Sequence, residues 1–383
     1  MFFTRWSLRL GIPLGLSAIA YAPELKTFVV VSCAALALVA VSALSRHATH
    51  NRLLTTQIKF NLMTLAVTVT VSLFLTEGIL RTVFRRQFKV IERERSLQYQ
   101  YDPELGWCPV PNLTHQFLNA RKVSVANNSL GFRGPEFQIT SKPTVAFVGD
   151  SYVWGYDVEV NERFTEKLQA RHPEWTLYNL GVAGYGTDQE YLILQRYLNR
   201  LPFRAVFLVF CELNDRSDNS SNFSNGWTKP YYRTNTAGLG LCGVPAPMTE
   251  TLFRIRHPVL YHAYVVRLLV RSALHWFGAQ PLDIPDPTEA IIADMNRFLQ
   301  TRGVPLAVGL ENRDRKLERF LTSQQIPWVD LYTPHRYAML DHWTPEGHDF
   351  VCQQIDNFLA TNNVFRQALA AGTNRSISAG AVK

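Results

Sequence analysis

Cysteine is scarce in this chain, with 5 in 383 residues, and no two cysteines stand at the spacing of a metal-ligand pair. We therefore expect no metal and no other cofactor. The cysteines could form disulfide bridges or remain free thiols, so they do not indicate whether the protein lies in an oxidising or a reducing compartment. No internal repeat is visible, which argues against a solenoid or a propeller. The formal net charge is +8, yet the basic residues form no nucleic-acid-binding motif, and we expect no nucleic-acid partner.

Long apolar runs, in contrast, are present near the N-terminus. Residues 27–44 and 60–80 are almost free of charge and long enough to cross about 30 Å of hydrocarbon, so both are expected to be transmembrane helices. Residues 10–22 are shorter and contain Pro13. They suit a third span, an interfacial helix or the apolar part of a signal sequence. Together, residues 1–95 are predicted to form a membrane region.

Basic residues flank these runs and indicate two opposite orientations. One set favours a cytoplasmic N-terminus and places the bulk of the chain outside: Arg5, Arg9, Arg46, Arg52 and Lys59. The other set, next to the following domain, favours the reverse: Arg81, Arg85, Arg86, Lys89, Arg93 and Arg95. Because long domains translocate largely regardless of flanking charge, we expect the domain to lie outside the cytoplasm. The second set is also suited to anionic lipid headgroups.

Beyond the membrane region, apolar runs typical of buried strands alternate with helical stretches. This alternation predicts an α/β domain with a flavodoxin-like, three-layer, doubly wound parallel sheet. The expected strands are 144–148, 175–177, 205–210, 305–309 and 328–331, and the expected helices are 288–301, 313–324 and 349–359. We expect a leader over 96–143, the sheet domain over 144–365 and a disordered polar tail over 366–383.

An insertion is expected within this domain, over about residues 216–285. Its first half, rich in Ser, Asn and Gly, predicts a loop over the carboxyl edge of the sheet. Residues 252–277 are apolar with interspersed arginines, which favours an amphipathic helix over a membrane span. This helix suits either the wall of an acyl or sugar pocket or ordinary packing against the core.

Gly149-Asp150-Ser151 follows the first expected strand directly. The carboxyl ends of parallel strands are where ligands bind in open α/β sheets, so Ser151 is placed as a nucleophile would be. The same triplet also suits a plain glycine turn with an N-capping Asp or Ser.

Three later segments add polar groups that could accompany a nucleophilic serine. Gly184 lies in the glycine-rich stretch 178–188, and glycines let backbone N–H groups approach a ligand closely. Asn214 follows the expected strand 205–210. Asp341 and His342 precede a helical stretch and supply a carboxylate and an imidazole.

In this order and spacing the four segments resemble the SGNH (GDSL-type) hydrolase family, whose blocks carry a Ser, a Gly, an Asn and a His. The resemblance implies Ser151 as the nucleophile and His342 as its general base. It also implies an oxyanion hole formed by Gly184, Asn214 and the backbone N–H of Ser151. The chemistry is consistent, because a serine hydroxyl needs a base to become a good nucleophile and a tetrahedral oxyanion needs preorganised donors.

The acid of the site departs from the family pattern. The family's acid usually precedes its histidine by two or three residues, where this chain has Leu340 and Met339. We predict that the adjacent Asp341 orients His342, which requires a sharp backbone turn because neighbouring side chains of an extended segment point to opposite sides. Asp330 or a backbone carbonyl are the alternatives.

One further departure from the family pattern and one alternative base concern the same site. Glu212 and Leu213 stand where the family has a glycine before its Asn-Asp pair, so this turn must be built differently. His348 is the alternative base. The leader contains Tyr101-Asp102-Pro103-Glu104-Leu105-Gly106-Trp107 and Asn128-Ser129-Leu130-Gly131-Phe132-Arg133-Gly134. These motifs resemble the leader of membrane-anchored bacterial members of the family, and we expect turns and short strands there. Within it Arg133 is the candidate substrate-binding residue, since a guanidinium can bind a carboxylate or a sugar hydroxyl.

The resemblance implies a serine esterase of the bacterial inner membrane, acting on an O-acyl group, of which O-acetyl is the first expectation, on a cell-surface glycan or lipid. Transfer of the acyl group to a polysaccharide is one alternative. A non-catalytic glycan-binding or assembly subunit is the other, suggested by the displaced acid. The expected partners are an acylated glycan or lipid, membrane lipid and a complex for polysaccharide synthesis or modification.

Overall fold

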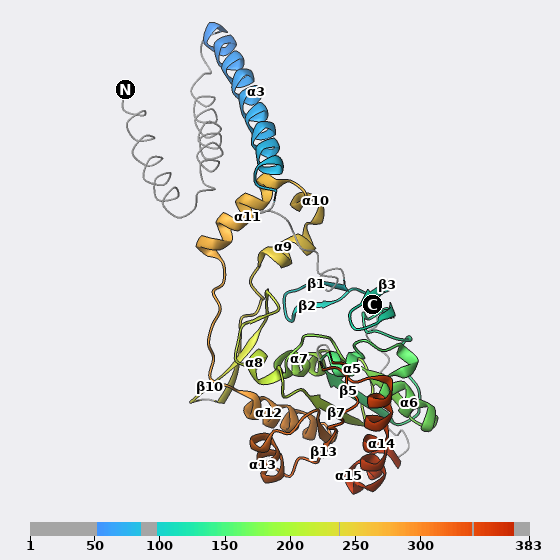
Figure 1. The fold of residues 1–383 in the computed structure, drawn as a ribbon. Coiled ribbons are helices and arrows are strands. Elements are labelled where there is room, and N and C mark those ends of the chain that lie inside the picture. Colours follow the sequence, from blue (N-terminus) through green and yellow to red (C-terminus); the bar gives the residue numbers. More distant parts are fainter. Residues whose placement is uncertain (1–51, 86–97, 237, 339–340, 371–383) are drawn as a thin grey trace. The chain divides into compact units, whose positions relative to one another are not determined.

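The computed structural model describes residues 52–85, 98–236, 238–338 and 341–370, and Figure 1 shows its elements. The chain divides into two compact units. One comprises Met1–Ile91 with His257–His275, and the other comprises Glu92–Arg256 with Trp276–Lys383. The expected segments 10–22 and 27–44 lie outside the described residues.

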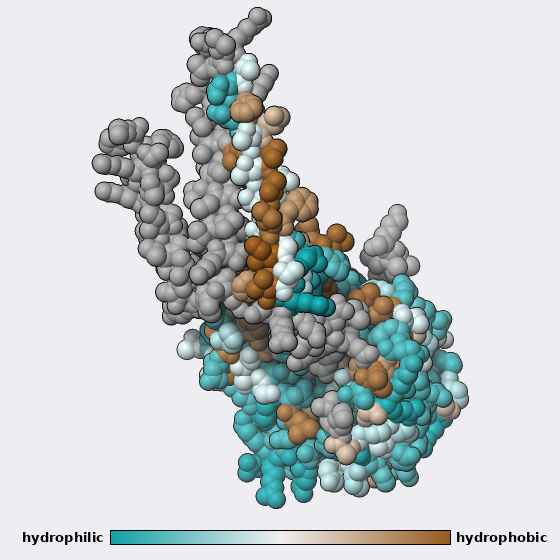
Figure 2. Space-filling model, turned by 45° about the horizontal axis from the view of Figure 1, so that its top comes forward, coloured by the Kyte–Doolittle hydropathy of each residue, from teal (hydrophilic) through white to brown (hydrophobic). Residues whose placement is uncertain are grey.

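The first unit contains α3 (Arg52–Thr82), which covers the expected span at 60–80. Its stretch Thr56–Thr82 is long and apolar enough to cross a membrane, at about 1.5 Å per residue. Figure 2 shows apolar, brown side chains along the visible side of this helix.

The segment expected as one amphipathic helix is instead three: α9 (Glu250–Arg256), α10 (Pro258–Tyr261) and α11 (Tyr264–Phe277). The chain breaks before Pro258, which has no N–H to donate and therefore begins a helix more readily than it continues one. Only α11 has the length of an ordinary amphipathic helix.

The second unit is built on a five-stranded sheet. Its strands are β5 (Thr144–Gly149), β6 (Thr176–Asn179), β7 (Ala205–Phe210), β12 (Leu306–Leu310) and β13 (Trp328–Asp330). Their order is β13-β12-β7-β5-β6, and every neighbouring pair is parallel. This is the doubly wound order of flavodoxin-like folds, so the predicted fold class is confirmed.

Helices cover both faces of the sheet (Figure 1). Alternate residues of β5 point to opposite faces, so Ala146 and Val148 belong to one apolar cluster and Val145 and Phe147 to the other. The first cluster includes side chains of α7 (Thr187–Tyr197), α12 (Thr288–Gln300) and α13 (Arg315–Ser323). The second includes side chains of α6 (Phe164–Arg171), α14 (Pro345–Thr361) and α15 (Asn363–Ala370).

Helix α15 corrects the expected start of the disordered tail at residue 366. Phe365 and Leu369 are buried in the second cluster, at a spacing of four that places both on one helix face. Residues from 371 onward lie outside the part of the chain that is described.

The leader forms two antiparallel hairpins, as expected for turns and short strands. They pair β1 (Tyr99–Asp102) with β2 (Gly106–Pro109) and β3 (Thr114–Leu118) with β4 (Lys122–Ala126).

The first half of the insertion, expected as a loop, contains elements of its own. They are α8 (Asp215–Asn219), β8 (Phe223–Ser224), β9 (Trp227–Thr228), β10 (Tyr231–Asn235) and β11 (Gly238–Cys242), with β8 paired to β9 and β10 paired to β11. Asn225 and Gly226 connect β8 to β9, both at positive φ, as a two-residue type I′ turn requires.

Candidate active site

Ser151 lies at the carboxyl end of β5, where the strand order of the sheet reverses. It is the first residue of the four-residue helix α5 (Ser151–Trp154). Asp150 is the N-cap and accepts a hydrogen bond from the backbone N–H of Tyr152 at 2.9 Å. Gly155 ends the helix in the left-handed conformation, at φ 81°. This short, doubly capped helix holds Ser151 beyond the strand end and lets the chain turn back beside it.

His342 is brought to Ser151 as the sequence predicts. Its Nε2 lies 2.9 Å from the Ser151 Oγ, and both residues are buried. The Tyr156 ring stacks on the imidazole with the ring centroids 4.4 Å apart. On the backbone, the Tyr337 N–H donates to the His342 carbonyl at 2.8 Å. The imidazole therefore faces the hydroxyl while its own position is fixed from two sides.

Asp157 faces the other nitrogen of the imidazole ring. Its Oδ2 lies 3.9 Å from Nδ1 of His342, and its side chain is fully buried. The Asn119 side-chain amide donates to the same Oδ2 at 2.8 Å, and the Ala120 N–H donates to Oδ1 at 2.9 Å. A separation of 3.9 Å exceeds a hydrogen bond, but the carboxylate faces the ring nitrogen that does not face Ser151.

Asp341 does not take the role predicted for it. Its carboxylate is 53% exposed and pairs with the Arg336 Nη1 at 2.9 Å. Its backbone does turn sharply, at φ 58°, and its carbonyl accepts a hydrogen bond from the Tyr152 hydroxyl at 2.8 Å. The prediction that Asp341 is the orienting acid is therefore corrected: Asp341 supports the loop, and Asp157 faces the ring. The alternative acid, Asp330, accepts from the Tyr332 N–H at 2.9 Å in its own turn.

Glu311 is a buried carboxyl near the site that the four sequence segments do not include. It directly follows β12, and it forms an ion pair with Arg336. Burial, partly opposed by Arg336, raises the pKa of Glu311 to about 7. Arg336 also donates to the Glu311 carbonyl at 2.8 Å. Together these two residues fix the start of the loop that delivers His342. The sequence feature that could have identified Glu311 is its place, as a charged residue directly after an apolar strand.

Arg133 is not placed to bind substrate. It is buried and donates to the carbonyls of Gly155 at 2.6 Å, Val158 at 2.8 Å and Ser124 at 2.8 Å. Its guanidinium also lies over the Trp154 ring at 4.6 Å. The predicted role of Arg133 in substrate binding is therefore corrected to that of a structural clamp on the turn that carries Asp157. Burial and the neighbouring Arg163 lower the pKa of Arg133 to about 9.

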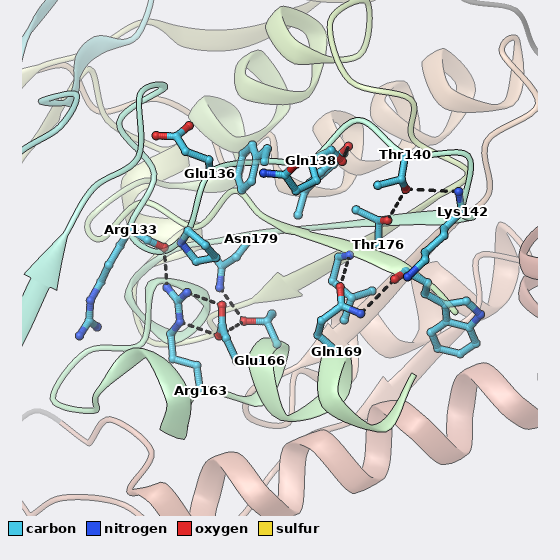
Figure 3. A pocket seen from close by; sticks show the side chains of 16 residues that line it. Arg133, Glu136, Gln138, Thr140, Lys142, Arg163, Glu166, Gln169, Thr176 and Asn179 are labelled. Carbon is cyan, nitrogen blue, oxygen red and sulfur yellow. Dashed lines mark hydrogen bonds and ion pairs between the residues drawn. The ribbon is translucent and has the colours of Figure 1, made fainter. Parts of the chain in front are cut away.

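Figure 3 shows Arg133 at the rim of a cavity of about 390 Å³, with its guanidinium directed away from the other lining side chains. The cavity lies beside the edge strand β6 and is lined by Gln138, Gln169 and Tyr178, among others. Its buried Arg163 is paired with Glu166 at 2.5 Å. This cavity is separate from the Ser151 and His342 pair.

The hairpin β3–β4 supports the site directly. Its turn supplies the two donors to Asp157, from Asn119 and Ala120. Phe117 on β3 packs edge-on against Trp154 and Tyr156, with ring centroids 5.8 and 4.8 Å apart. Tyr156 is the ring that stacks on the imidazole. The leader therefore holds both the Asp157 carboxylate and the ring that stacks on His342.

The predicted oxyanion-hole residues lie on loops that reach this edge of the sheet. Gly184 has a φ of 87°, which favours glycine, and follows Val182, whose N–H donates to the Gly149 carbonyl at 3.0 Å. Asn214 is the N-cap of α8 and hydrogen-bonds with Asp150. Its Nδ2 also donates to an Asp218 carboxylate oxygen at 3.2 Å. Ser151 is the first residue of a helix, so its N–H has no acceptor within that helix.

A second buried carboxyl lies behind Asp150. Asp215 is completely buried and accepts from the Cys211 N–H at 2.9 Å, which closes the turn that lacks the family's glycine. Burial raises the pKa of Asp150, and burial together with Asp150 raises the pKa of Asp215.

His348, the alternative base, has a structural role. Its Nδ1 accepts from the Phe164 N–H at 3.3 Å, and the Phe164 ring stacks on the imidazole. Burial, then the charges of Lys167 and Arg163, lower the pKa of His348 well below its usual value. This residue links α14 to α6.

Within the described ranges, no group of three or more His, Cys, Asp or Glu side chains could hold a metal ion. Cys108, Cys211, Cys242 and Cys352 are free thiols.

No protein-family model matches the chain, and no curated protein sequence is similar to it. Solved structures that are similar include a G-D-S-L family lipolytic protein from Veillonella parvula, at 14% identity, covering 57% of this chain and 99% of that one, with a TM-score of 0.33. The esterase EstA from a Pseudoalteromonas species has 8% identity over 57% of this chain and 97% of its own, with a TM-score of 0.34. A lipase/acylhydrolase from Enterococcus faecalis has 13% identity over 57% and 95%, with a TM-score of 0.31.

Proposed function

We propose that this chain is a membrane-anchored serine esterase that removes an O-acyl group, with O-acetyl as the first expectation, from a cell-surface glycan or lipid. The observation that carries the proposal is the 2.9 Å separation between the Ser151 Oγ and the His342 Nε2. An imidazole acceptor at hydrogen-bond distance is what a serine hydroxyl needs to become a nucleophile. Both side chains are nearly buried, which strengthens the electrostatic interactions in the site.

The reaction follows from this geometry. The Ser151 Oγ attacks the ester carbonyl while the His342 Nε2 takes the hydroxyl proton. The imidazolium that forms is stabilised by the Asp157 carboxylate on its other side. The tetrahedral oxyanion is bound by the Ser151 N–H together with the predicted donors of Gly184 and Asn214. His342 then gives the proton to the leaving alcohol, which leaves the acyl group on Ser151. In the second half of the reaction, His342 takes a proton from a water molecule that attacks the acyl carbonyl, and it returns the proton to the Ser151 Oγ as the carboxylic acid leaves.

The membrane anchor rests on α3, whose stretch Thr56–Thr82 is long and apolar enough to span a bilayer. We propose the bacterial inner membrane, with the sheet domain outside the cytoplasm. A cysteine introduced as Ser378→Cys tests the orientation. A membrane-impermeant thiol reagent should label it on intact cells, and labelling only after lysis would place the domain in the cytoplasm.

A fluorophosphonate probe tests the nucleophile, because it labels only an activated serine. The native chain should be labelled and should hydrolyse a soluble aryl acetate. Ser151→Ala should lose both properties, while the control Ser323→Ala, on α13, should keep both. Absence of labelling in the native chain would favour a non-catalytic glycan-binding or assembly subunit. Acyl transfer to an added polysaccharide, in place of acetate release, would identify an acyltransferase.

A further inference from the structure

Helix α11 carries an exposed apolar stripe. Phe277 is 89% exposed, Trp276 is 66% exposed, and Leu269 and Ala273 are also exposed. These residues stand at positions i, i+4, i+7 and i+8 of one helix, so they share a face. Val259 and Leu260 on the preceding α10 are exposed as well. Exposed apolar residues gathered in this way mark an interaction surface.

The opposite face of α11 is basic. Arg267 and Arg271 are each two residues from a member of the stripe, which is a rotation of about 200° on a helix of 3.6 residues per turn. The Arg267 guanidinium lies over the rings of Tyr261 and Tyr264, at 5.0 and 4.4 Å. An apolar face backed by arginines and flanked by tyrosines is typical of a helix that lies in a membrane interface.

Contacts with α3 place α11 at one end of the candidate span. The Glu77 carboxylate accepts hydrogen bonds from the backbone N–H groups of Tyr264 at 3.0 Å and Val265 at 2.9 Å. These are the first two residues of α11, whose N–H groups have no acceptor within the helix. Leu268 packs on Leu80, and both side chains are buried.

The Arg81 guanidinium adds a further link, since it donates to the His262 carbonyl at 2.9 Å and pairs with Glu77 at 2.6 Å. Leu80 and Arg81 lie in the last turn of α3. If α3 crosses the bilayer, its last turn is at the boundary between hydrocarbon and headgroups, because Thr56–Thr82 is somewhat longer than the roughly 20 residues that the hydrocarbon core needs. A helix fixed to that turn must lie at the same boundary.

We propose that α10 and α11 form an interfacial helical element that binds the surface of an anionic bilayer, with the stripe in the acyl region and Arg267 and Arg271 among the headgroup phosphates. This inference rests on the membrane anchor of the proposed function. The basic residues at the end of α3 add to this positive charge, with Arg81 in its last turn and Arg85 just beyond it. The element holds the chain at the membrane by a second contact, far from the span in the sequence.

Spin labels on single cysteines test the proposal in the full chain, with the five native cysteines replaced by serine and the protein reconstituted in phosphatidylglycerol and phosphatidylethanolamine vesicles. Labels at Leu269→Cys and Phe277→Cys should collide more with lipid-soluble oxygen than with an aqueous nickel chelate. A label at the matched control Arg271→Cys, on the opposite face, should show the reverse preference.

Two outcomes overturn the proposal. Labels on the stripe that prefer the nickel chelate would place it in water, and labels shielded from both reagents would show that protein covers it. A label at Phe74→Cys, a residue of α3 that is 74% exposed, separates this inference from the anchor. Oxygen preference at Phe74 with water exposure at Leu269 refutes only the interfacial element, whereas nickel preference at Phe74 refutes the membrane span.

Discussion

Asp157 and His342 face each other across 3.9 Å, between Oδ2 and Nδ1, while the opposite ring nitrogen faces Ser151. The three residues therefore stand in the order of a triad, with one contact longer than a hydrogen bond. Catalytic hydrogen bonds are often long before substrate binds and shorten in the complex. Asp157 is fixed by two donors, whereas His342 lies on a loop. We therefore expect this loop to move when substrate binds, so that the distance between Nδ1 and Oδ2 shortens.

Asp157→Asn should lower turnover of an aryl acetate by up to about ten-thousandfold, because an amide favours the wrong imidazole tautomer. Asp341→Asn should cost no more than about fivefold, since it removes only an exposed ion pair worth about 0–1 kcal/mol. Both variants are assayed above the histidine pKa, with thermal unfolding as the check on folding. A larger loss for Asp341→Asn would restore Asp341 as the acid.

Arg133→Lys should lower kcat by about ten- to a hundredfold with little change in KM, because a small displacement of a catalytic group is costly. The ammonium group cannot reach the three carbonyls that the guanidinium holds. Arg121→Lys is the matched control, as it lies on the same leader and pairs with Glu162 near the surface. A rise in KM at constant kcat would instead mean that Arg133 binds substrate.

His348→Phe should preserve most of the turnover but lower the free energy of unfolding by about 1–3 kcal/mol, because the buried Phe164 N–H loses its acceptor. His342→Ala should show the opposite pattern, with turnover reduced by about a thousandfold or more. Denaturant unfolding and steady-state kinetics of both variants provide the comparison. An inactive His348→Phe variant of native stability would identify His348 as the base.

His172 should make stability depend on pH. Burial acts to lower its pKa, but Asp356 and Glu174, at 2.8 and 2.7 Å, outweigh burial and hold the pKa above the usual 6.5. A raised pKa in the folded state adds stability that is complete below the unfolded pKa and is lost as the pH rises through the folded pKa. The amplitude should be at most about 1 kcal/mol, because these pairs are partly exposed. His172→Gln should flatten the unfolding free energy over this window, and an unchanged slope would contradict the assignment.

The sequence could predict the parts of the site that follow a local pattern. Ser151 follows a buried strand directly, and His342 precedes a helix in a recognisable segment, so each could be located without its partner. Asp157 has no such pattern. Its position depends on the turn at Gly155 and on donors from Asn119 and Ala120, which are nearly forty residues earlier in the chain. Contacts at that sequence separation leave no periodic signal.

The sequence does not predict the position of Arg133 correctly, because residue type alone does not reveal whether a guanidinium binds a ligand or the backbone of its own chain. Its acceptors lie on residues 124, 155 and 158, which only the folded chain brings together. The hairpin β8–β9 is a different case. Asn225-Gly226 is a strong hairpin signal by itself, but the surrounding polar residues led to the prediction of a loop.

The β3–β4 hairpin changes where the chain can be divided. By its strands the sheet domain begins at Thr144, yet the donors that hold Asp157 and the ring that packs on Tyr156 all precede that residue. A fragment starting at β5 would retain Ser151 and His342 but not the support of their acid. A soluble, active form of this protein, or an exchange of its membrane region with that of another protein, must therefore keep β3 and β4 and be cut before Thr114.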